Sequence, residues 1–285
     1  GSKKRDIVSA YAAVDGSPFA FANLKLTARY DIVDGKSMGI FPTATFSYQM
    51  PFLKSLTTTL GYSHNYRNPS LNDLYWYPGG NENLLAENGR TLDFALKYAL
   101  KKERFSIELR SGIYASKVKN WIQWVPTEYR FWVPENVALV FARGVENHLS
   151  IAYNYKDWKF AVSGNYVFTA TTDESDLADA NGNKGKQLIY IPRHHANLFA
   201  DVHWKQWNLN YTLEMTGVRN TSYATSSYFS YDLPAYVLHH IALGRQIGKF
   251  KLELRCNNFT DKAYQNVLWR AMPGRSWEIM AGWKF

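Results

Sequence analysis

Apolar and polar residues alternate with a period of two along most of the chain. The pattern is clearest at the C-terminal end, where Trp277, Ile279, Ala281, Trp283 and Phe285 share one parity. Glu278, Gly282 and Lys284 share the other parity. Because side chains of a strand point alternately to its two faces, residues 276–285 are predicted to form a strand with one apolar, aromatic face. Its length is close to the ~9–11 residues of a transmembrane strand.

The same alternation recurs along the chain, and no long segment has helical spacing. We expect Leu209, Leu252 and Ile279 to face lipid, and Asn210 and Glu253 to face the lumen of a barrel. Counting a weak first segment, the pattern predicts thirteen strands: near residues 3–14, 24–30, 43–50, 56–66, 91–100, 105–110, 143–155, 158–171, 193–204, 207–216, 236–246, 250–255 and 276–285.

The connections between these segments alternate between short and long. Short ones are expected near residues 15–18, 50–55, 101–103, 156–157, 205–206 and 247–249. Long ones are expected near 67–90, 118–142, 172–192, 220–235 and 259–275, and 31–39 is modest. Short turns on one rim and long loops on the other are typical of an outer-membrane barrel, whereas a β-sandwich has no reason to sort its loops. The pattern predicts an all-β, antiparallel transmembrane β-barrel with its short turns and C-terminus in the periplasm.

Aromatic residues flank the short turns, where an interfacial girdle is expected. They are Phe105, Trp158, Trp204, Trp207, Phe250 and Phe285. Thirteen strands do not close by themselves, because bacterial single-chain barrels are antiparallel with an even strand number. If residues 3–14 are not a strand, twelve would close. We expect residues 1–285 to be the C-terminal portion of a larger barrel.

Composition narrows the alternatives. The chain has 285 residues, 46% of them hydrophobic, and a single cysteine, which excludes an internal disulfide framework and a multi-cysteine metal site. The net charge of +9 is spread along the chain rather than clustered, so no nucleic-acid partner is expected. An outer-membrane protein needs a signal peptide and none appears, so we expect the N-terminal part to be missing.

Three stretches resemble the TonB-dependent outer-membrane transporters. Residues 66–76, Y-R-N-P-S-L-N-D-L-Y-W, and 79–87, G-G-N-E-N-L-L-A-E, are similar to that family's F-R-A-P-S-L-x-x-L-Y and G-N-P-x-L-x-P-E loop. Residues 257–264, N-N-F-T-D-K-A-Y, resemble its N-L-F-D-x-x-Y, and 273–276, P-G-R-S, resemble its entry into the closing strand. Residues 72–76 and 191–195, I-P-R-H-H, most resemble cobalamin receptors.

This resemblance implies an architecture and a role. Such transporters have 22 strands and a plugged lumen, so the chain would supply the C-terminal 12–13 strands, and the plug domain and TonB box are absent from it. The resemblance implies active transport of a large scarce solute across the outer membrane of a Gram-negative bacterium. Cobalamin is the first candidate, and a ferric siderophore or haem is the alternative. A passive porin or a surface adhesin is the alternative from another class.

The resemblance also implies partners. They are the TonB complex, reached through a plug domain that is not in this chain, and the lipid and lipopolysaccharide of the outer membrane. Whether a surface lipoprotein joins them stays open. No cofactor is expected.

Candidate ligand-binding residues are aromatic and polar side chains on the long loops. A large, partly apolar ligand needs aromatic walls with a few polar anchors. The alternative is that the rings pack the loops against their neighbours. The candidates are Tyr75, Trp76, Tyr77, Asn81, Trp124, Trp132, Tyr228, Trp269 and Arg270.

Metal and catalytic sites have little support. Residues 194–195 and 239–240 are His-His pairs, but neighbouring residues on a strand point to opposite faces and do not chelate as a pair. The acidic stretch within 172–192 offers ligands of the kind that calcium takes, without EF-hand spacing, and a solvated loop is the alternative. No triad, phosphate loop or carboxylate pair stands out, so an enzyme is not expected.

Overall fold

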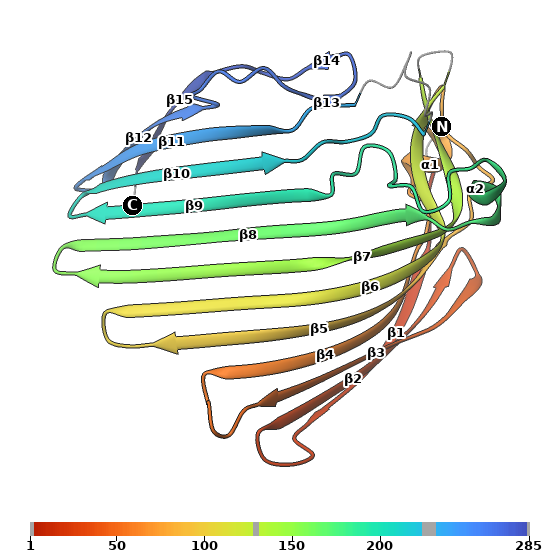
Figure 1. The fold of residues 1–285 in the computed structure, drawn as a ribbon, viewed down its shortest axis with the longest axis horizontal. Helices are drawn as coiled ribbons and strands as arrows, with labels where there is room; N and C mark the ends of the chain where they lie inside the picture. Colours follow the sequence, from red (N-terminus) through yellow and green to blue (C-terminus); the bar gives the residue numbers. More distant parts are fainter. Residues whose placement is uncertain (1–2, 128–130, 224–231, 284–285) are drawn as a thin grey trace. The chain divides into compact units, whose positions relative to one another are not determined.

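The computed structural model describes residues 3–127, 131–223 and 232–283. Strands dominate it (Figure 1). Two short helices, α1 (Leu71–Tyr75) and α2 (Asp176–Ala180), lie in connections. The strands are β1 (Ile7–Gly16), β2 (Ala22–Val33), β3 (Lys36–Gln49), β4 (Leu56–Arg67), β5 (Glu87–Lys101), β6 (Phe105–Pro126), β7 (Trp132–Tyr155), β8 (Trp158–Asp173), β9 (His194–Trp204), β10 (Trp207–Thr216), β11 (Tyr236–Ile247), β12 (Phe250–Asn257), β13 (Gln265–Val267), β14 (Arg270–Ala271) and β15 (Ser276–Trp283).

Thirteen strands form one sheet in the order β1 to β12, followed by β15. Neighbours in the chain are neighbours in the sheet, and the described pairs are antiparallel, as for β1 with β2 and β12 with β15. The predicted all-β antiparallel class is confirmed, and the weak first segment is a strand. β13 and β14 form a separate two-stranded hairpin. Within the residues described, no helix is long and apolar enough to cross a membrane.

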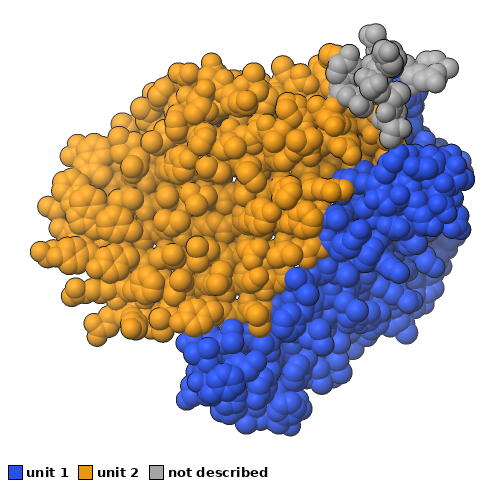
Figure 2. All heavy atoms as spheres, viewed as in Figure 1, with its two compact units in different colours: residues 1–95, 113–143, 170–187 blue, residues 96–112, 144–169, 188–285 orange. Residues whose placement is uncertain are grey.

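The chain divides into two compact units (Figure 2). Unit 1 comprises residues 1–95, 113–143 and 170–187, and unit 2 comprises residues 96–112, 144–169 and 188–285. Unit 1 holds the connection that contains α1 and the outer part of the β6–β7 hairpin. Unit 2 holds the C-terminal strands and the β13–β14 hairpin.

The strand register of unit 2 separates an apolar face from a polar one. Directly opposed residues share a face, and Leu209 lies opposite Leu243, which lies opposite Leu254, which lies opposite Ile279. Asn210 belongs to the other parity of β10, as Glu253 does in β12. The predicted division of these residues between two faces is confirmed. Lys284 and Phe285 lie outside the described residues.

The structure corrects two expected connections. The modest connection 31–39 is a tight turn, because β2 ends at Val33 and β3 begins at Lys36. Residues 118–142 are not a long loop, because β6 continues to Pro126, β7 begins at Trp132, and Thr127 N donates to Phe131 O over 2.9 Å. The alternation fails within β6 because both faces are covered at residues 122–123. Ile122 and Gln123, which point to opposite faces, are 6% and 9% exposed. A strand that is buried on both faces shows no period of two.

Candidate functional site

Helix α1 is fixed at its start by a reciprocal pair of hydrogen bonds. Asp73 N donates to Ser70 Oγ over 3.0 Å, and Ser70 N donates to Asp73 Oδ2 over 2.7 Å. This is a capping box, which satisfies two backbone N–H groups at the helix N-terminus. The other oxygen of Asp73 accepts from Trp124 Nε1 over 2.9 Å. The carboxylate, in a residue that is 6% exposed, therefore joins α1 to β6.

An ion pair joins the residues that flank the connection 68–86. Arg67, the last residue of β4, donates from Nε to Glu87 Oε2 over 2.8 Å, and Glu87 begins β5. Glu87 Oε1 also accepts from Ile122 N over 2.8 Å. Arg67 NH1 lies 3.8 Å from Asp73 Oδ2. One guanidinium thus stands between two nearly buried carboxylates.

These contacts decide the charge of Asp73. Burial alone would raise the pKa of its carboxyl group. Hydrogen bonds from Ser70 and Trp124 and the positive charge of Arg67 outweigh burial, and the pKa of Asp73 lies below its ordinary value of 3.8. The carboxylate is therefore ionised at neutral pH, which its role as a hydrogen-bond acceptor requires.

The rest of the connection rests on the β6–β7 hairpin. Asn81 Nδ2 donates to Pro134 O over 3.1 Å, and Leu85 N donates to Asn136 Oδ1 over 2.8 Å. At Gly79 the backbones meet, because an added Cβ would lie 2.0 Å from the carbonyl oxygen of Trp132. Only glycine fits there without a backbone shift. We call residues 68–86 with the outer part of the hairpin, 120–127 and 131–136, the loop cluster.

The loop cluster brings together six predicted site residues. Tyr75, Trp76 and Tyr77 are 38%, 55% and 91% exposed. Lys3 Nζ lies 4.0 Å from the centre of the Tyr75 ring. By contrast, Trp124, Trp132 and Asn81 are partly buried, and Trp124 and Asn81 brace the cluster through the contacts above. Trp124 and Asn81 therefore pack the loops against each other, whereas the rings of residues 75–77 are exposed and available to a ligand.

Two further candidates lie on the β13–β14 hairpin of unit 2. Trp269 is 75% exposed, and its backbone N donates to Gln265 Oε1 over 3.1 Å. Its φ of 66° places it in the left-handed region, at the turn of the hairpin. Arg270 follows it and is exposed. Tyr228 lies outside the described residues.

A buried arginine holds this hairpin. Arg219 is 4% exposed, and its NH2 donates to Gln265 O over 3.0 Å. Its guanidinium lies 5.2 Å from the centre of the Tyr236 ring, and the Tyr236 hydroxyl donates to Asn266 Oδ1 over 2.7 Å. Burial lowers the pKa of Arg219, and no carboxylate pairs with it within the described chain. Sequence reasoning missed Arg219, because nothing near it in sequence signals burial.

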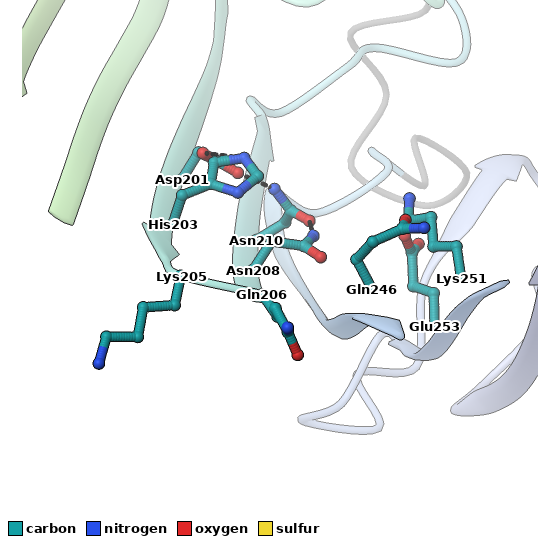
Figure 3. A pocket seen from close by; sticks show the side chains of 9 residues that line it. All are labelled: Asp201, His203, Lys205, Gln206, Asn208, Asn210, Gln246, Lys251 and Glu253. Atoms are coloured by element: carbon teal, nitrogen blue, oxygen red, sulfur yellow. Dashed lines mark hydrogen bonds and ion pairs between the residues drawn. The ribbon is translucent and has the colours of Figure 1, made fainter. Parts of the chain in front are cut away.

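The polar face of unit 2 contains a cavity of about 350 Å³ (Figure 3). Glu253, between Lys251 and Arg255, lies 3.0 Å from a nitrogen of each. Asn208 Nδ2 donates to Asn210 Oδ1 over 2.8 Å, and Asn210 donates in turn to Asp201. The side chains that line this cavity are polar or charged, and they supply hydrogen-bond donors and acceptors. It comprises Asp201, His203, Lys205, Gln206, Asn208, Asn210, Gln246, Lys251 and Glu253.

His194, His239 and Asp173, which could serve as metal ligands, form hydrogen bonds within the protein. In the described ranges, no three His, Cys, Asp or Glu side chains gather as a metal site. The His194 and His239 rings meet Tyr166 and Tyr211 hydroxyls at 2.9 and 2.7 Å. In the acidic stretch, Asp173 Oδ1 accepts from Ser175 N over 2.9 Å. The neighbouring Glu174 N donates to Leu139 O over 2.9 Å, which ties the stretch to β7.

Comparison with known proteins decides the family. A family model described as a TonB dependent receptor-like β-barrel matches residues 4–259. The chain belongs to this family. The TonB-dependent receptors are β-barrel receptors of the Gram-negative outer membrane and are not enzymes, in agreement with the class expected from sequence.

Individual relatives cover most of this chain. The vitamin B12 transporter BtuB of Photobacterium profundum is 26% identical over 250 residues, which are 84% of this chain and 38% of the relative. The siderophore receptor PirA of Acinetobacter baumannii matches 99% of this chain with a TM-score of 0.72 and 14% identity. The copper transporter OprC matches 99% with a TM-score of 0.69 and 16% identity.

The chain spans less than half the length of these relatives. It covers 46% of the PirA chain and 48% of the OprC chain. At such identities the solved structures establish the fold, and the ligand is a separate question.

Proposed function

We propose that residues 1–285 form the C-terminal portion of the barrel of a TonB-dependent outer-membrane receptor that imports a large scarce solute. The family match over residues 4–259 carries this proposal. Energy coupling would pass from the TonB complex through a plug domain. Cobalamin is the first candidate ligand, supported by the loop resemblance and by the relative named as a vitamin B12 transporter.

The distribution of aromatic residues supports an orientation. Trp158, Trp204 and Trp207 lie beside short turns, on strands whose outward residues are apolar. Aromatic rings in this position favour a membrane interface. We place the short turns in the periplasm and the long loops, including the loop cluster and the β13–β14 hairpin, outside the cell.

The exposed rings of the loop cluster are suited to a large ligand. Tyr75, Trp76 and Tyr77 leave apolar surface in water on a loop whose backbone is fixed at Asp73, Gly79 and Asn81. A loop held before binding loses less conformational entropy when the ligand arrives. An aromatic ring covers an apolar edge of a corrinoid, whose amides accept and donate hydrogen bonds at its rim.

The β13–β14 hairpin offers a second pair of contacts. Trp269 presents an aromatic face, and Arg270 carries five N–H donors suited to a phosphate or an amide oxygen. Both side chains are exposed, so a ligand outside the hairpin can reach them. We propose that both contact the ligand.

Binding of cyanocobalamin to the full-length receptor in outer-membrane vesicles tests this function. The double substitution Trp269→Ala, Arg270→Ala should weaken binding about thirtyfold, since a lost aromatic contact and a lost hydrogen bond cost on the order of 2 kcal/mol. Phe52→Ala with Lys54→Ala, which removes an exposed ring and a cation from a short turn, should leave binding unchanged.

The outcomes separate the candidates. Unchanged cyanocobalamin affinity in a normally assembled double variant would show that these residues do not bind it. Saturable binding of a ferric siderophore or haem, without cyanocobalamin binding, would favour the alternative cargo. Absence of saturable binding of all three would favour a porin or an adhesin.

A further inference from the structure

The four short turns of unit 2 form one continuous edge. They join β5 to β6, β7 to β8, β9 to β10, and β11 to β12, and they lie together along the left-hand side of Figure 1. One backbone hydrogen bond links each turn to the next, three in all among the described residues. Asn154 N donates to Arg104 O, Lys205 N to Asp157 O and Gln246 N to Gln206 O, over 2.8, 3.4 and 2.8 Å. We call this edge the short-turn rim.

The short-turn rim carries far more positive than negative charge. Its only acidic residues within the described chain are Glu103 and Asp157. Seven of its exposed cations form no ion pair with a carboxylate within the described residues, whereas Lys251, opposite Gln246 in the register, pairs with Glu253. These seven cations are Lys101, Lys102, Arg104, Lys156, Lys205, Arg245 and Lys249.

Two of these lysines occupy backbone positions that disfavour them. Lys156 and Lys205 have φ of 52° and 53°, in the left-handed region where tight turns prefer glycine or asparagine. The β11–β12 turn has glycine at such a position, Gly248, with φ of 58°. The Lys156 and Lys205 ammonium groups lie 5.4 Å from the ring centres of Tyr155 and Trp204. Turn geometry therefore does not favour lysine at these two positions, and both ammonium groups lie against aromatic rings of the rim.

Arg245 is a cation on the apolar face. Trp204 lies opposite Trp207, which lies opposite Arg245, which lies opposite Leu252, so all four share one face. Its guanidinium lies 4.8 Å from the centre of the Trp207 ring. A charge on the lipid face is costly at the bilayer midplane and tolerated near the interface. Arg245 therefore belongs at the level of the lipid headgroups.

We propose that the short-turn rim binds anionic glycerophospholipid headgroups, with Arg245 and Lys205 holding the phosphate between Trp204 and Trp207. A planar guanidinium pairs with two phosphate oxygens, and a neighbouring ammonium adds a point charge. The tryptophan rings fix the depth of the bilayer at the same level. This inference rests on the membrane-spanning barrel and on the proposed orientation, and it does not depend on which solute is imported.

The test measures lipid retained by the full-length receptor. The receptor is purified in a neutral detergent and titrated with dioleoyl phosphatidylglycerol or dioleoyl phosphatidylcholine, and bound lipid is counted by native mass spectrometry. Phosphatidylglycerol should bind with saturation and phosphatidylcholine should not compete. Lys205→Gln with Arg245→Gln should weaken phosphatidylglycerol binding about thirtyfold, given the usual contribution of two cations at an anionic surface.

Matched variants exclude a general loss of charge or structure. Arg193→Gln with Lys262→Gln removes two exposed cations from the long-loop ends of unit 2 and should leave phosphatidylglycerol binding unchanged. Lys205→Arg with Arg245→Lys keeps both charges and should keep most of the binding. Equal retention of the two lipids, or equal loss in the two Gln variants, would overturn the proposal.

A measurement on the unmodified receptor covers the case in which the Gln variant fails to assemble. Raising the salt concentration from about 0.01 M to about 1 M shortens the Debye length from about 30 Å to about 3 Å. Binding of phosphatidylglycerol should fall steeply over this range. Salt-independent binding would contradict a headgroup site built from exposed cations. Cyanocobalamin binding, measured in the same samples, distinguishes failure of the lipid site from failure of the proposed cargo.

Discussion

The loop cluster of unit 1 and the β13–β14 hairpin of unit 2 both present exposed aromatic side chains. Different interactions of an arginine stabilise the two regions. In the loop cluster, Arg67 stands between the carboxylates of Asp73 and Glu87, and every partner is a charge or a strong donor. At the hairpin, Arg219 is buried against a tyrosine ring and a carbonyl, with no carboxylate beside it among the described residues. The first arrangement depends on ionisation, and the second on packing.

This difference matters for how each region responds to change. Removing one member of a buried charged network leaves the others without partners, which is costly. A buried cation that lacks a counter-ion has already lost its hydration, so an apolar side chain of similar length replaces it at smaller cost. The loop cluster should therefore be the more fragile of the two.

The largest effect is expected for Asp73→Ala. It removes the capping box, leaves the Trp124 indole N–H without its acceptor and removes a partner of Arg67, so the loop cluster should lose about 3 kcal/mol of local stability. Hydrogen exchange of the full-length receptor should show faster exchange over residues 70–86. Glu82→Ala, an exposed carboxylate in the same connection, is the control. Equal protection in both variants would mean that Asp73 does not brace the cluster.

A smaller effect is expected for Arg219→Met. The change loses a hydrogen bond to Gln265 O and the contact with Tyr236, and keeps most of the buried volume. The hairpin should lose on the order of 1–2 kcal/mol. Hydrogen exchange over residues 265–271 measures it, with the loop cluster as internal reference. A loss larger than that of Asp73→Ala would reverse the comparison.

Acid should separate the two regions without any substitution. The pKa of Asp73 is lowered in the folded protein, so its stabilisation is complete above its ordinary value of 3.8 and is lost as the pH falls from there through the lowered pKa. Arg219 stays cationic across that range. Exchange over residues 70–86 should accelerate below about pH 4, while exchange over 265–271 should not follow the same titration. Parallel acceleration in both regions would indicate general unfolding instead.

The smallest effect on folding is expected for Tyr77→Ala. The side chain is 91% exposed, so the melting temperature of the receptor should stay the same. Affinity for the ligand should nonetheless fall about fivefold, as a lost aromatic contact of about 1 kcal/mol implies. Titration calorimetry and a thermal melt on the same preparation measure both. A lower melting temperature with unchanged affinity would make Tyr77 a packing residue.

The sequence predicted the fold where one face of a strand is apolar and the other polar. The alternation of Leu254 and Glu253 along β12 could be recognised in the sequence, because the two faces of this strand lie in different environments. The same reasoning failed at residues 118–126 and 132–142, where Ile122 and Gln123, on opposite faces of β6, are both buried. The period of two reports a difference between faces and disappears with it.

The candidate site was predictable only in its exposed part. The rings of residues 75–77 stand out in the sequence, and the Ser70–Asp73 spacing is a local capping signal that was available and not used. The bond from Trp124 to Asp73 and the burial of Arg219 join residues that are distant in sequence. No local pattern contains them, because they depend on which loops the strands bring together.

The most direct test of the proposed function is equilibrium binding by the unmodified full-length receptor. Cyanocobalamin, a ferric catecholate siderophore and haem are each titrated against outer-membrane vesicles that contain it, with vesicles lacking it as the blank. We expect saturable binding of cyanocobalamin that neither iron ligand displaces. Saturable binding of an iron ligand that cyanocobalamin fails to displace would contradict it.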